Sequence, residues 1–276
     1  MPSFETRAAD WLSFGEARDR ILRRAAPLET ESVAADDALG RALAGPLNAE
    51  ITLPPWDNSA MDGYAVAARE VEGAREGAPV ILAVAREIRP GDEAGPALEP
   101  GQAARIMTGA PVPAGADSVV RVEDTDREAA ESGRVRILSD RDAGGNVRPA
   151  GEDLREGERI YEAGTGIGPG QVAVLTALGV RRVEVHRRPR VAVLASGDEL
   201  AGPDDFDRVR AGRAIPNSNS PLVAAAARIA GADPVRLGIA ADSEESVREH
   251  LLRSLGSDVL VTLGGASMGA GDLFKG

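Results

Sequence analysis

The sequence predicts a mixed α/β protein that carries an inserted β domain. Helix-start and helix-stop signals occur near both ends of the first 185 residues, and short apolar runs separated by Gly- and Pro-rich turns lie between them. Such runs are typical of a compact β domain. Beyond residue 186, apolar runs alternate with helical patterns, which favours a parallel βαβ sheet. We therefore divide the chain into an N-terminal α/β lobe (1–50 and 144–185), an inserted β domain (51–143) and a C-terminal α/β domain (186–276).

The N-terminal lobe is predicted to begin with a helix. Ser13 and Glu16 form a capping-box pattern, because a hydroxyl and a carboxylate three residues apart can each bind a free backbone N–H. Pro27 ends this helix. We expect a second short helix over residues 36–43 and an extended run over 47–53.

The segment that returns to this lobe is predicted to contain a helix over residues 171–178. Pro169 precedes it and Gly179 follows it, which is the usual placement of these two residues around a helix. Arg148 and Asp153 lie earlier in the same segment. They form either an anion contact or a surface salt bridge that contributes little stability.

The inserted domain is predicted to be a compact, barrel-like β structure. Its apolar runs are short, and Gly- and Pro-rich turns separate them, as in small barrels. The predicted strands cover residues 80–84, 103–107, 118–122 and 134–138.

The loop at the entry to this domain, Leu53 to Val66, concentrates aromatic and polar residues in a chain that is only 3% aromatic. Two prolines stiffen its start, and Asp57-Asn58-Ser59 can form a turn by bonding its own backbone. The loop is either an ordered interdomain turn or a rigid frame that presents the Asp62 carboxylate. Thr108, at the end of a predicted strand, is likewise either a plain turn residue or a functional hydroxyl.

The C-terminal domain is predicted to be a βαβαβ unit with parallel strands and right-handed crossovers. The strands cover residues 190–195, 234–240 and 258–263, with helices over 220–230 and from 245 onwards. Asp242 is expected to cap the second of these helices together with Glu245.

Acidic residues and glycines gather where these strands end. Asp198 and Glu199 follow the first strand, Asp242 follows the second, and a glycine-rich loop ending in Asp272 follows the third. Open parallel sheets bind ligands outside the carboxyl ends of their strands. Carboxylates around a phosphate would repel it without a hard cation, and Mg²⁺ prefers oxygen ligands. A phosphate and magnesium site is one interpretation; helix caps and surface acids are the other.

Composition excludes several classes of function. The net charge of −12 argues against a nucleic-acid partner. The absence of cysteine excludes disulfides and thiolate metal sites, and with only His186 and His250 we do not expect zinc binding or histidine-based catalysis. We expect no membrane span, no secretory signal and a cytoplasmic location.

Three motifs, in register, resemble those of the molybdopterin molybdenumtransferases, the MoeA and gephyrin E-domain family. The first is Pro-x-x-Asp-Asn-Ser-Ala-Met-Asp-Gly-Tyr-Ala at residues 54–65. The others are Arg-Ile-Met-Thr-Gly-Ala-Pro-Val-Pro at 105–113 and Ser-Gly-Asp-Glu-Leu at 196–200. The resemblance covers nearly the whole chain and implies that its C-terminal domain is MogA-like.

The resemblance also implies roles for individual residues. The implied catalytic residues are Asp62, Thr108, Glu199 and Asp242. Residues implied to bind the pterin phosphate are Ser196, Gly197, Asn219, Gly264, Gly265, Ser267, Gly269 and Arg148, and those implied to hold Mg²⁺ are Asp242 and Asp272. The implied reaction inserts molybdate into adenylylated molybdopterin and releases AMP. The implied partners are a second copy of the chain, whose inserted domain faces the sheet, a molybdopterin adenylyltransferase and apo-molybdoenzymes.

The sequence departs from the family pattern at three places. Pro149 replaces an arginine, the segment 215–220 lacks an acidic residue, and the chain ends at Gly276 after three predicted parallel strands. We therefore expect a C-terminally truncated member, with an unpaired sheet edge and exposed apolar surface. The alternative function is a non-catalytic molybdopterin-binding or scaffold fragment of the same fold. A plain nucleotide-binding adenylyltransferase would leave the 53–66 loop unexplained.

Overall fold

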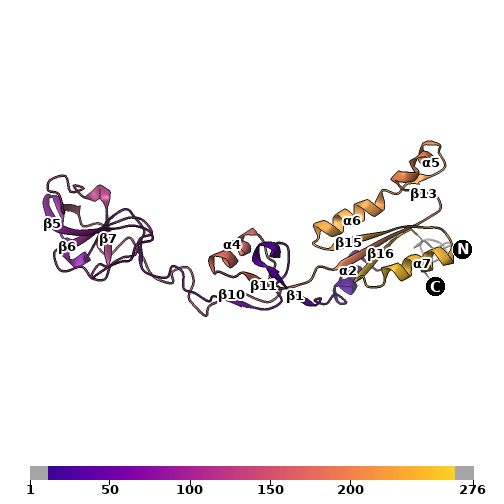
Figure 1. Cartoon of the computed structure of the whole chain (residues 1–276), viewed down its shortest axis with the longest axis horizontal. Coiled ribbons are helices and arrows are strands. Elements are labelled where there is room, and N and C mark those ends of the chain that lie inside the picture. Colours follow the sequence, from indigo (N-terminus) through magenta and orange to yellow (C-terminus); the bar gives the residue numbers. More distant parts are fainter. Residues whose placement is uncertain (1–11, 265–276) are drawn as a thin grey trace. The chain divides into compact units, whose positions relative to one another are not determined.

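The computed structural model describes residues 12–264. The chain divides into two compact units, one of residues 46–161 and one of residues 1–45 and 162–276 (Figure 1). This partition is coarser than the three domains predicted from the sequence, whose boundaries stay a prediction.

The unit of residues 46–161 is built on a five-stranded mixed sheet. Its strand order is β7-β4-β6-β5-β8, and all neighbours are antiparallel except β5 and β6. Register shifts in the long β5 are the kind of irregularity that bends a strand and increases its twist. The bounds are β4 Gly63–Val66, β5 Arg75–Ile88, β6 Gln102–Ile106, β7 Ser118–Arg121 and β8 Arg134–Ser139.

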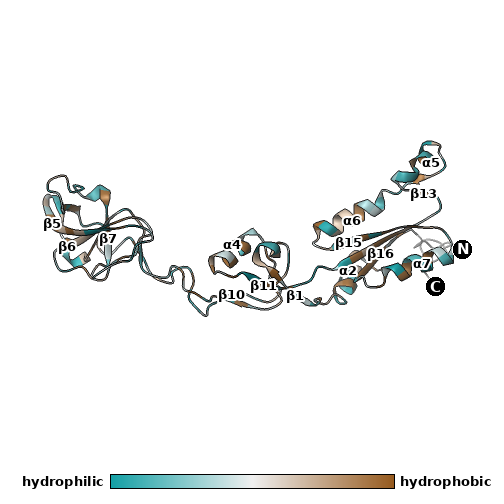
Figure 2. Cartoon of the chain, viewed as in Figure 1, coloured by the Kyte–Doolittle hydropathy of each residue, from teal (hydrophilic) through white to brown (hydrophobic). Residues whose placement is uncertain are grey.

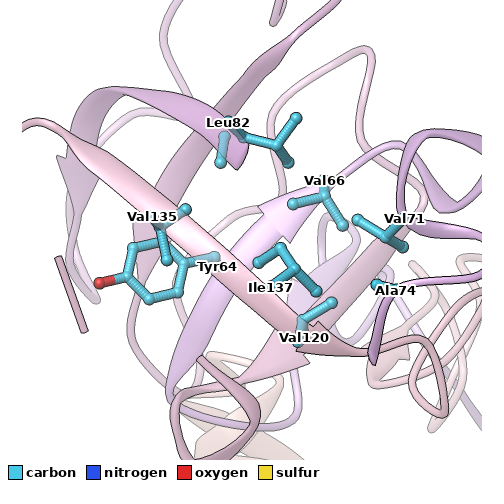
Figure 3. Close-up of a cluster of buried hydrophobic side chains, with 9 residues drawn as sticks. Tyr64, Val66, Val71, Ala74, Leu82, Val120, Val135 and Ile137 are labelled. Carbon is cyan, nitrogen blue, oxygen red and sulfur yellow. The ribbon is translucent and has the colours of Figure 1, made fainter. Parts of the chain in front are cut away.

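Both faces of this sheet are buried at β4, whereas alternate residues of β5 and β8 are exposed. Tyr64 and Val66 of β4 join one cluster with residues of β5, β7 and β8, and Figure 3 shows these side chains gathered together. Ala65, between them, belongs to a second cluster with Ile106 and Val119. The alternation follows from the two-residue period of a strand and explains why all four residues of β4 are buried.

The 53–66 loop is held by its own polar groups. Asp57 Oδ1 accepts a hydrogen bond from the Ala150 N–H at 2.7 Å. Asn58 and Ser59 are buried and form the short strand β3 (Asn58–Ser59), which pairs with β9 (Val147–Arg148). At Gly63 a Cβ atom would lie 2.0 Å from the Val120 carbonyl oxygen, so only glycine fits.

Shorter elements complete this unit. They are β2 Leu47–Asn48, α3 Ala68–Val71, the 3₁₀ turn η3 Val122–Asp124 and β10 Arg159–Tyr161. β2 pairs with β10. The predicted extended run over 47–53 is therefore paired at its start and again at Leu53, which bridges Leu154, but bends at residues 50 and 51 interrupt it.

The other unit contains the parts of the predicted N-terminal lobe that precede residue 46 and follow residue 161. Helix α2 (Phe14–Leu22) has the predicted capping box, with the Ser13 N–H and the Glu16 side chain 2.8 Å apart. Strand β1 (Thr30–Ala34) pairs antiparallel with β11 (Arg182–His186), and α4 (Pro169–Ala177) matches the helix predicted there.

The predicted helix over residues 36–43 is wrong beyond its first turn. Only a 3₁₀ turn, η2 (Ala35–Ala38), forms. Leu39 is extended, and the backbone N–H groups of Gly40 and Leu43 donate to the carbonyls of Ile167 and Thr165. These backbone N–H groups therefore pair with residues 165–167, and they are not available for the hydrogen bonds of a helix.

The C-terminal part is a three-stranded parallel sheet of order β15-β12-β16, as predicted. Helices α6 and α7 both contact β12 and β15 and lie on opposite sides of the sheet (Figure 1). The bounds are β12 Arg190–Ser196, β13 Leu200–Ala201, η4 Pro203–Asp205, α5 Phe206–Arg210, β14 Ile215–Pro216, α6 Asn219–Ile229, β15 Asp233–Ala240, α7 Glu244–Ser254 and β16 Val259–Leu263.

Strand β12 is the buried centre of this sheet, with six of its seven residues buried. Figure 2 shows the strands of this sheet as mainly hydrophobic and α5 as mainly hydrophilic. No residue of β16 is buried, and within residues 12–264 no strand pairs with its outer edge.

Candidate functional site

The carboxyl end of β12 carries the first group of predicted site residues. Ser196 is the last residue of the strand and is 8% exposed. Gly197 follows with φ +145°, and a Cβ atom there would lie 2.5 Å from Glu199 Oε2. The Glu199 carboxylate therefore folds back over the Gly197 backbone, in a position that any larger residue at 197 would block.

Asp242 joins this group from the end of β15. The Ser196 hydroxyl donates to Asp242 Oδ1 at 3.2 Å. The Asp242 N–H donates to Asp198 Oδ1 at 3.2 Å, and the Asp198 N–H lies 3.5 Å from Asp242 Oδ2. The two neighbouring strand ends are thus tied by reciprocal contacts, and Ser196, Glu199 and Asp242 lie at one edge of the sheet.

The sequence predicted that Asp242 caps α7, and this prediction is wrong. The N-cap is Ser243, whose hydroxyl accepts the Ser246 N–H at 3.3 Å. The Asp242 carboxylate instead bonds the residues that end β12, because the parallel register places Ser196 beside Ala240.

A cavity of about 310 Å³ opens beside these strand ends. Its lining includes four predicted site residues: Ser196, Glu199, Asn219 and Gly264. Gly264 has φ +92°, and a Cβ atom there would lie 2.7 Å from the Ser196 carbonyl oxygen, so this glycine lets the end of β16 approach β12. The cavity is small, polar in part and bordered by the first residue of α6.

Two further residues belong to this edge: Asn217, which the sequence did not predict, and Asp198, which it placed at this edge without assigning it a role. Asn217 lines the cavity, and its side-chain oxygen accepts from the Ser220 N–H and hydroxyl at 3.3 and 2.9 Å. Asp198 bonds Asp242 as described above. The sequence signals were the Asn-Ser-Asn-Ser run before α6 and the position of Asp198 directly after a buried strand.

Asp62 and Thr108 form a separate pair in the unit of residues 46–161. Asp62 Oδ1 accepts the Thr108 N–H at 2.7 Å and the Thr108 hydroxyl at 2.8 Å. These two hydrogen bonds, the backbone one first, lower the pKa of the Asp62 carboxyl. The side chain is exposed, so the loop holds an ionised carboxylate in a defined orientation toward solvent.

Arg148, another predicted ligand residue, is engaged within its own segment. Its Nε donates to Glu152 at 2.7 Å, and its Nη2 donates to both Asp153 oxygens at 3.0 Å. The surface salt bridge considered for Arg148 and Asp153 is present. A role for Arg148 in binding phosphate stays a prediction.

The remaining predicted residues, Gly265, Ser267, Gly269 and Asp272, lie outside the described residues. Within residues 12–264 there is no group of three or more His, Asp or Glu side chains placed to hold a metal ion. The oxygen donors at the sheet edge, Glu199 and Asp242 with the Ser196 hydroxyl, are nevertheless of the type that Mg²⁺ accepts together with phosphate and water.

Comparison with known proteins identifies the family. A model of the MoeA N-terminal region, domains I and II, matches residues 12–179. A second model, described as a probable molybdopterin binding domain, matches residues 192–275. The chain belongs to the MoeA family. The resemblance inferred from the three sequence motifs is confirmed.

Two relatives named molybdopterin molybdenumtransferase support this assignment. A molybdopterin molybdenumtransferase of Nostoc sp. is 38% identical over 242 residues, which cover 87% of this chain and 54% of the relative. That of Bacillus subtilis is 38% identical over 247 residues, which cover 87% of this chain and 56% of the relative. The chain thus spans just over half the length of these two relatives.

The fold agrees with that of a solved MoeA structure. The molybdopterin biosynthesis MoeA protein of Pyrococcus horikoshii OT3 superposes with a TM-score of 0.78 at 31% identity, over 86% of this chain and 62% of that protein. The predicted fold class is confirmed. No helix among residues 12–264 has both the length and the apolar character to span a bilayer.

Proposed function

We propose that this chain acts in molybdenum cofactor biosynthesis as a molybdopterin molybdenumtransferase. The reaction inserts molybdate into adenylylated molybdopterin and releases AMP. The observation that carries the proposal is the cavity at the carboxyl ends of β12 and β16, where Ser196, Glu199, Asn219 and Gly264 meet, with Asp242 bonded to Ser196. We place the protein in the cytoplasm, with a second copy of itself as its main partner.

The cavity residues have roles that follow from their chemistry. Asn219 is the first residue of α6, and a helix N-terminus favours a phosphate because free N–H groups point toward it. Gly264 leaves room for close backbone approach. The Asn219 amide donates to phosphate oxygens, and the Ser196 hydroxyl, which donates to Asp242, orients that carboxylate. Glu199 and Asp242 supply the negative charge that holds a cation against the phosphates.

Mg²⁺ is part of the proposal because the donors at this edge are hard oxygens. Asp242 would hold it, with Asp272 of the glycine-rich loop as the second protein ligand. When bound, Mg²⁺ supplies charge neutralisation and Lewis-acid polarisation of phosphate oxygens.

Asp62 and Thr108 are proposed to act on the substrate bound by the partner subunit. Thr108 keeps Asp62 ionised and oriented through its two hydrogen bonds. An exposed carboxylate of fixed orientation can accept a proton or position water at the reacting centre.

The proposal is tested by mixing the purified chain with molybdopterin-AMP, Mg²⁺ and molybdate and measuring AMP release and bound molybdenum. Glu199→Gln and Asp242→Asn should each weaken magnesium-dependent binding about tenfold or more, because each removes one of the negative charges that hold the cation; tenfold in affinity is about 1.4 kcal/mol. Asp207→Asn, whose exposed carboxylate pairs with Arg210 on the surface of α5, is the matched control.

Each outcome decides between functions. AMP release that both site variants reduce supports the transferase. Tight magnesium-dependent binding without turnover supports a binding or scaffold role instead. Unchanged affinity in Glu199→Gln and Asp242→Asn removes these residues from the site.

A further inference from the structure

A second cavity lies at the opposite edge of the same parallel sheet. Its volume is about 760 Å³, which is within the range of small-molecule pockets. Its lining includes Arg190 and Asp233, the first residues of β12 and β15. It is therefore at the amino ends of the strands, and the cavity described above is at their carboxyl ends. The arginines in its lining are Arg41, Arg187, Arg188, Arg190 and Arg228.

Three of these arginines are held in place by the fold. Arg187 donates to both oxygens of Asp258, at 2.7 and 2.6 Å, and to Glu29 at 2.7 Å. Arg188 donates to the carbonyls of Gly231 and Leu39 at 3.1 and 3.2 Å. Arg41 is buried and binds the His186 carbonyl and Glu31.

The other two arginines have no such partners. Within residues 12–264, the guanidinium groups of Arg190 and Arg228 form no hydrogen bond and no ion pair, and both side chains are exposed. The charge of Arg190 contributes to lowering the pKa of Asp258, but Arg187 is the larger cause. Both guanidinium groups therefore keep their hydrogen-bond donors available to a ligand.

The charge balance of the lining is positive. Arg41 is bound by Glu31, and Arg187 is bound by two carboxylates, Glu29 and Asp258. With Asp233, four carboxylates accompany the five arginines, which leaves an excess of one positive charge. This excess stands out in a chain whose net charge is −12.

Helix electrostatics explain the position of only one of the three arginines Arg188, Arg190 and Arg228. Arg228 lies in the last turn of α6, where a cation stabilises the helix by roughly 0.3–1 kcal/mol. Arg188 and Arg190 lie on the segment that enters β12. Their convergence with Arg228 on one cavity needs another cause.

We propose that this cavity binds a polyvalent anion of the phosphate class. Arginine suits this ligand because its planar group donates two parallel hydrogen bonds to phosphate oxygens. Arg188 is already oriented by two carbonyls, and Arg190 and Arg228 supply the free donors. The site is separate from the substrate cavity, since the length of the strands lies between them.

Isothermal titration with inorganic pyrophosphate tests the proposal, at low ionic strength and without Mg²⁺, so that magnesium-dependent binding at the other edge does not contribute. We expect saturable one-site binding to the full chain. The double variant Arg190→Gln/Arg228→Gln should lose at least about tenfold in affinity, because two charge-assisted hydrogen-bond donors are removed. Both residues are exposed, so the variant leaves no buried group unpaired.

The control is Arg248→Gln, which removes an exposed arginine paired with Glu244 on α7. Its affinity should stay within about twofold of the unmodified chain. Absence of saturable binding overturns the proposal. So does an equal loss in the control, or full affinity in the double variant. If the double variant unfolds, the single variant Arg228→Gln decides by the same criterion.

Discussion

A single buried carboxylate shows how side-chain chemistry stabilises the unit of residues 46–161. Asp142 is 6% exposed. Its two oxygens accept Arg121 Nε and Nη2, each at 2.8 Å. These hydrogen bonds lower the pKa of Asp142 to about 2. The pair ties the segment after β8 to the end of β7, which borders the Asp62 loop.

We expect Asp142→Asn to destabilise this unit by about 2 kcal/mol at neutral pH, because a carboxyl pKa lowered from its ordinary value near 3.8 to about 2 stabilises the folded state by roughly that amount. The lowered pKa means that this stabilisation is full above pH ~4–5 and is lost as the pH falls toward 2. Urea unfolding across this range measures it. Glu93→Gln, an exposed change in the same unit, should have no such effect; a pH-independent penalty at position 142 would contradict the assignment.

At the scale of elements, helix α7 of the C-terminal sheet has little buried apolar surface and a side-chain cap at its start. In α7 only Val247 is buried; Leu252 within the helix and Leu255 directly after it are exposed. Packing therefore stabilises this helix less than a fully covered one. The Ser243 hydroxyl accepts a hydrogen bond from the Ser246 N–H. This cap therefore contributes a larger part of the stability of α7.

Ser243→Ala should destabilise the unit that contains α7 by about 1 kcal/mol, the usual cost of losing an N-cap. Thermal or urea unfolding of the whole chain measures the change. Glu249→Ala, an exposed position in the same helix, removes no cap, and we expect a change below about 0.5 kcal/mol. Equal effects of the two substitutions would show that the cap is unimportant.

At the scale of the molecule, the chain consists of two units with separate cores. Residues 46–161 bury two hydrophobic clusters of their own, one on each face of the five-stranded sheet. The chain passes from one unit to the other twice, after residue 45 and after residue 161. Each core is closed by residues of its own unit.

A fragment of residues 46–161 should therefore fold alone. Its amide NMR resonances should overlay those of the same residues in the whole chain, except near the two cut ends. A fragment with unfolded chemical shifts would show that this unit needs the other for stability.

Much of the fold could be predicted because it depends on local patterns. The period of apolar residues predicts β12, β15, β16 and their helices, and the capping box at Ser13 predicts the start of α2. The failures share one cause. At residues 39–43 and at Asp242, distant segments supply hydrogen-bond partners that no local pattern reveals.

The site was predictable in part for the same reason. Strand ends are local signals, so Ser196, Glu199 and Asp242 could be placed at one edge from the order of elements alone. The bond between Ser196 and Asp242, and the convergence of Arg188, Arg190 and Arg228 at the other edge, arise from residues far apart in the chain.

The sequence by itself determined the family, the βαβαβ order and the edge of the sheet at which the acidic residues gather, since each is written in motifs or in periodic apolar residues. The tertiary structure alone decided which carboxylates are bound and which arginines are free. Hydrogen-bond partners are set by distances in space, and the parallel register of β12, β15 and β16 brings together groups that the chain order keeps apart.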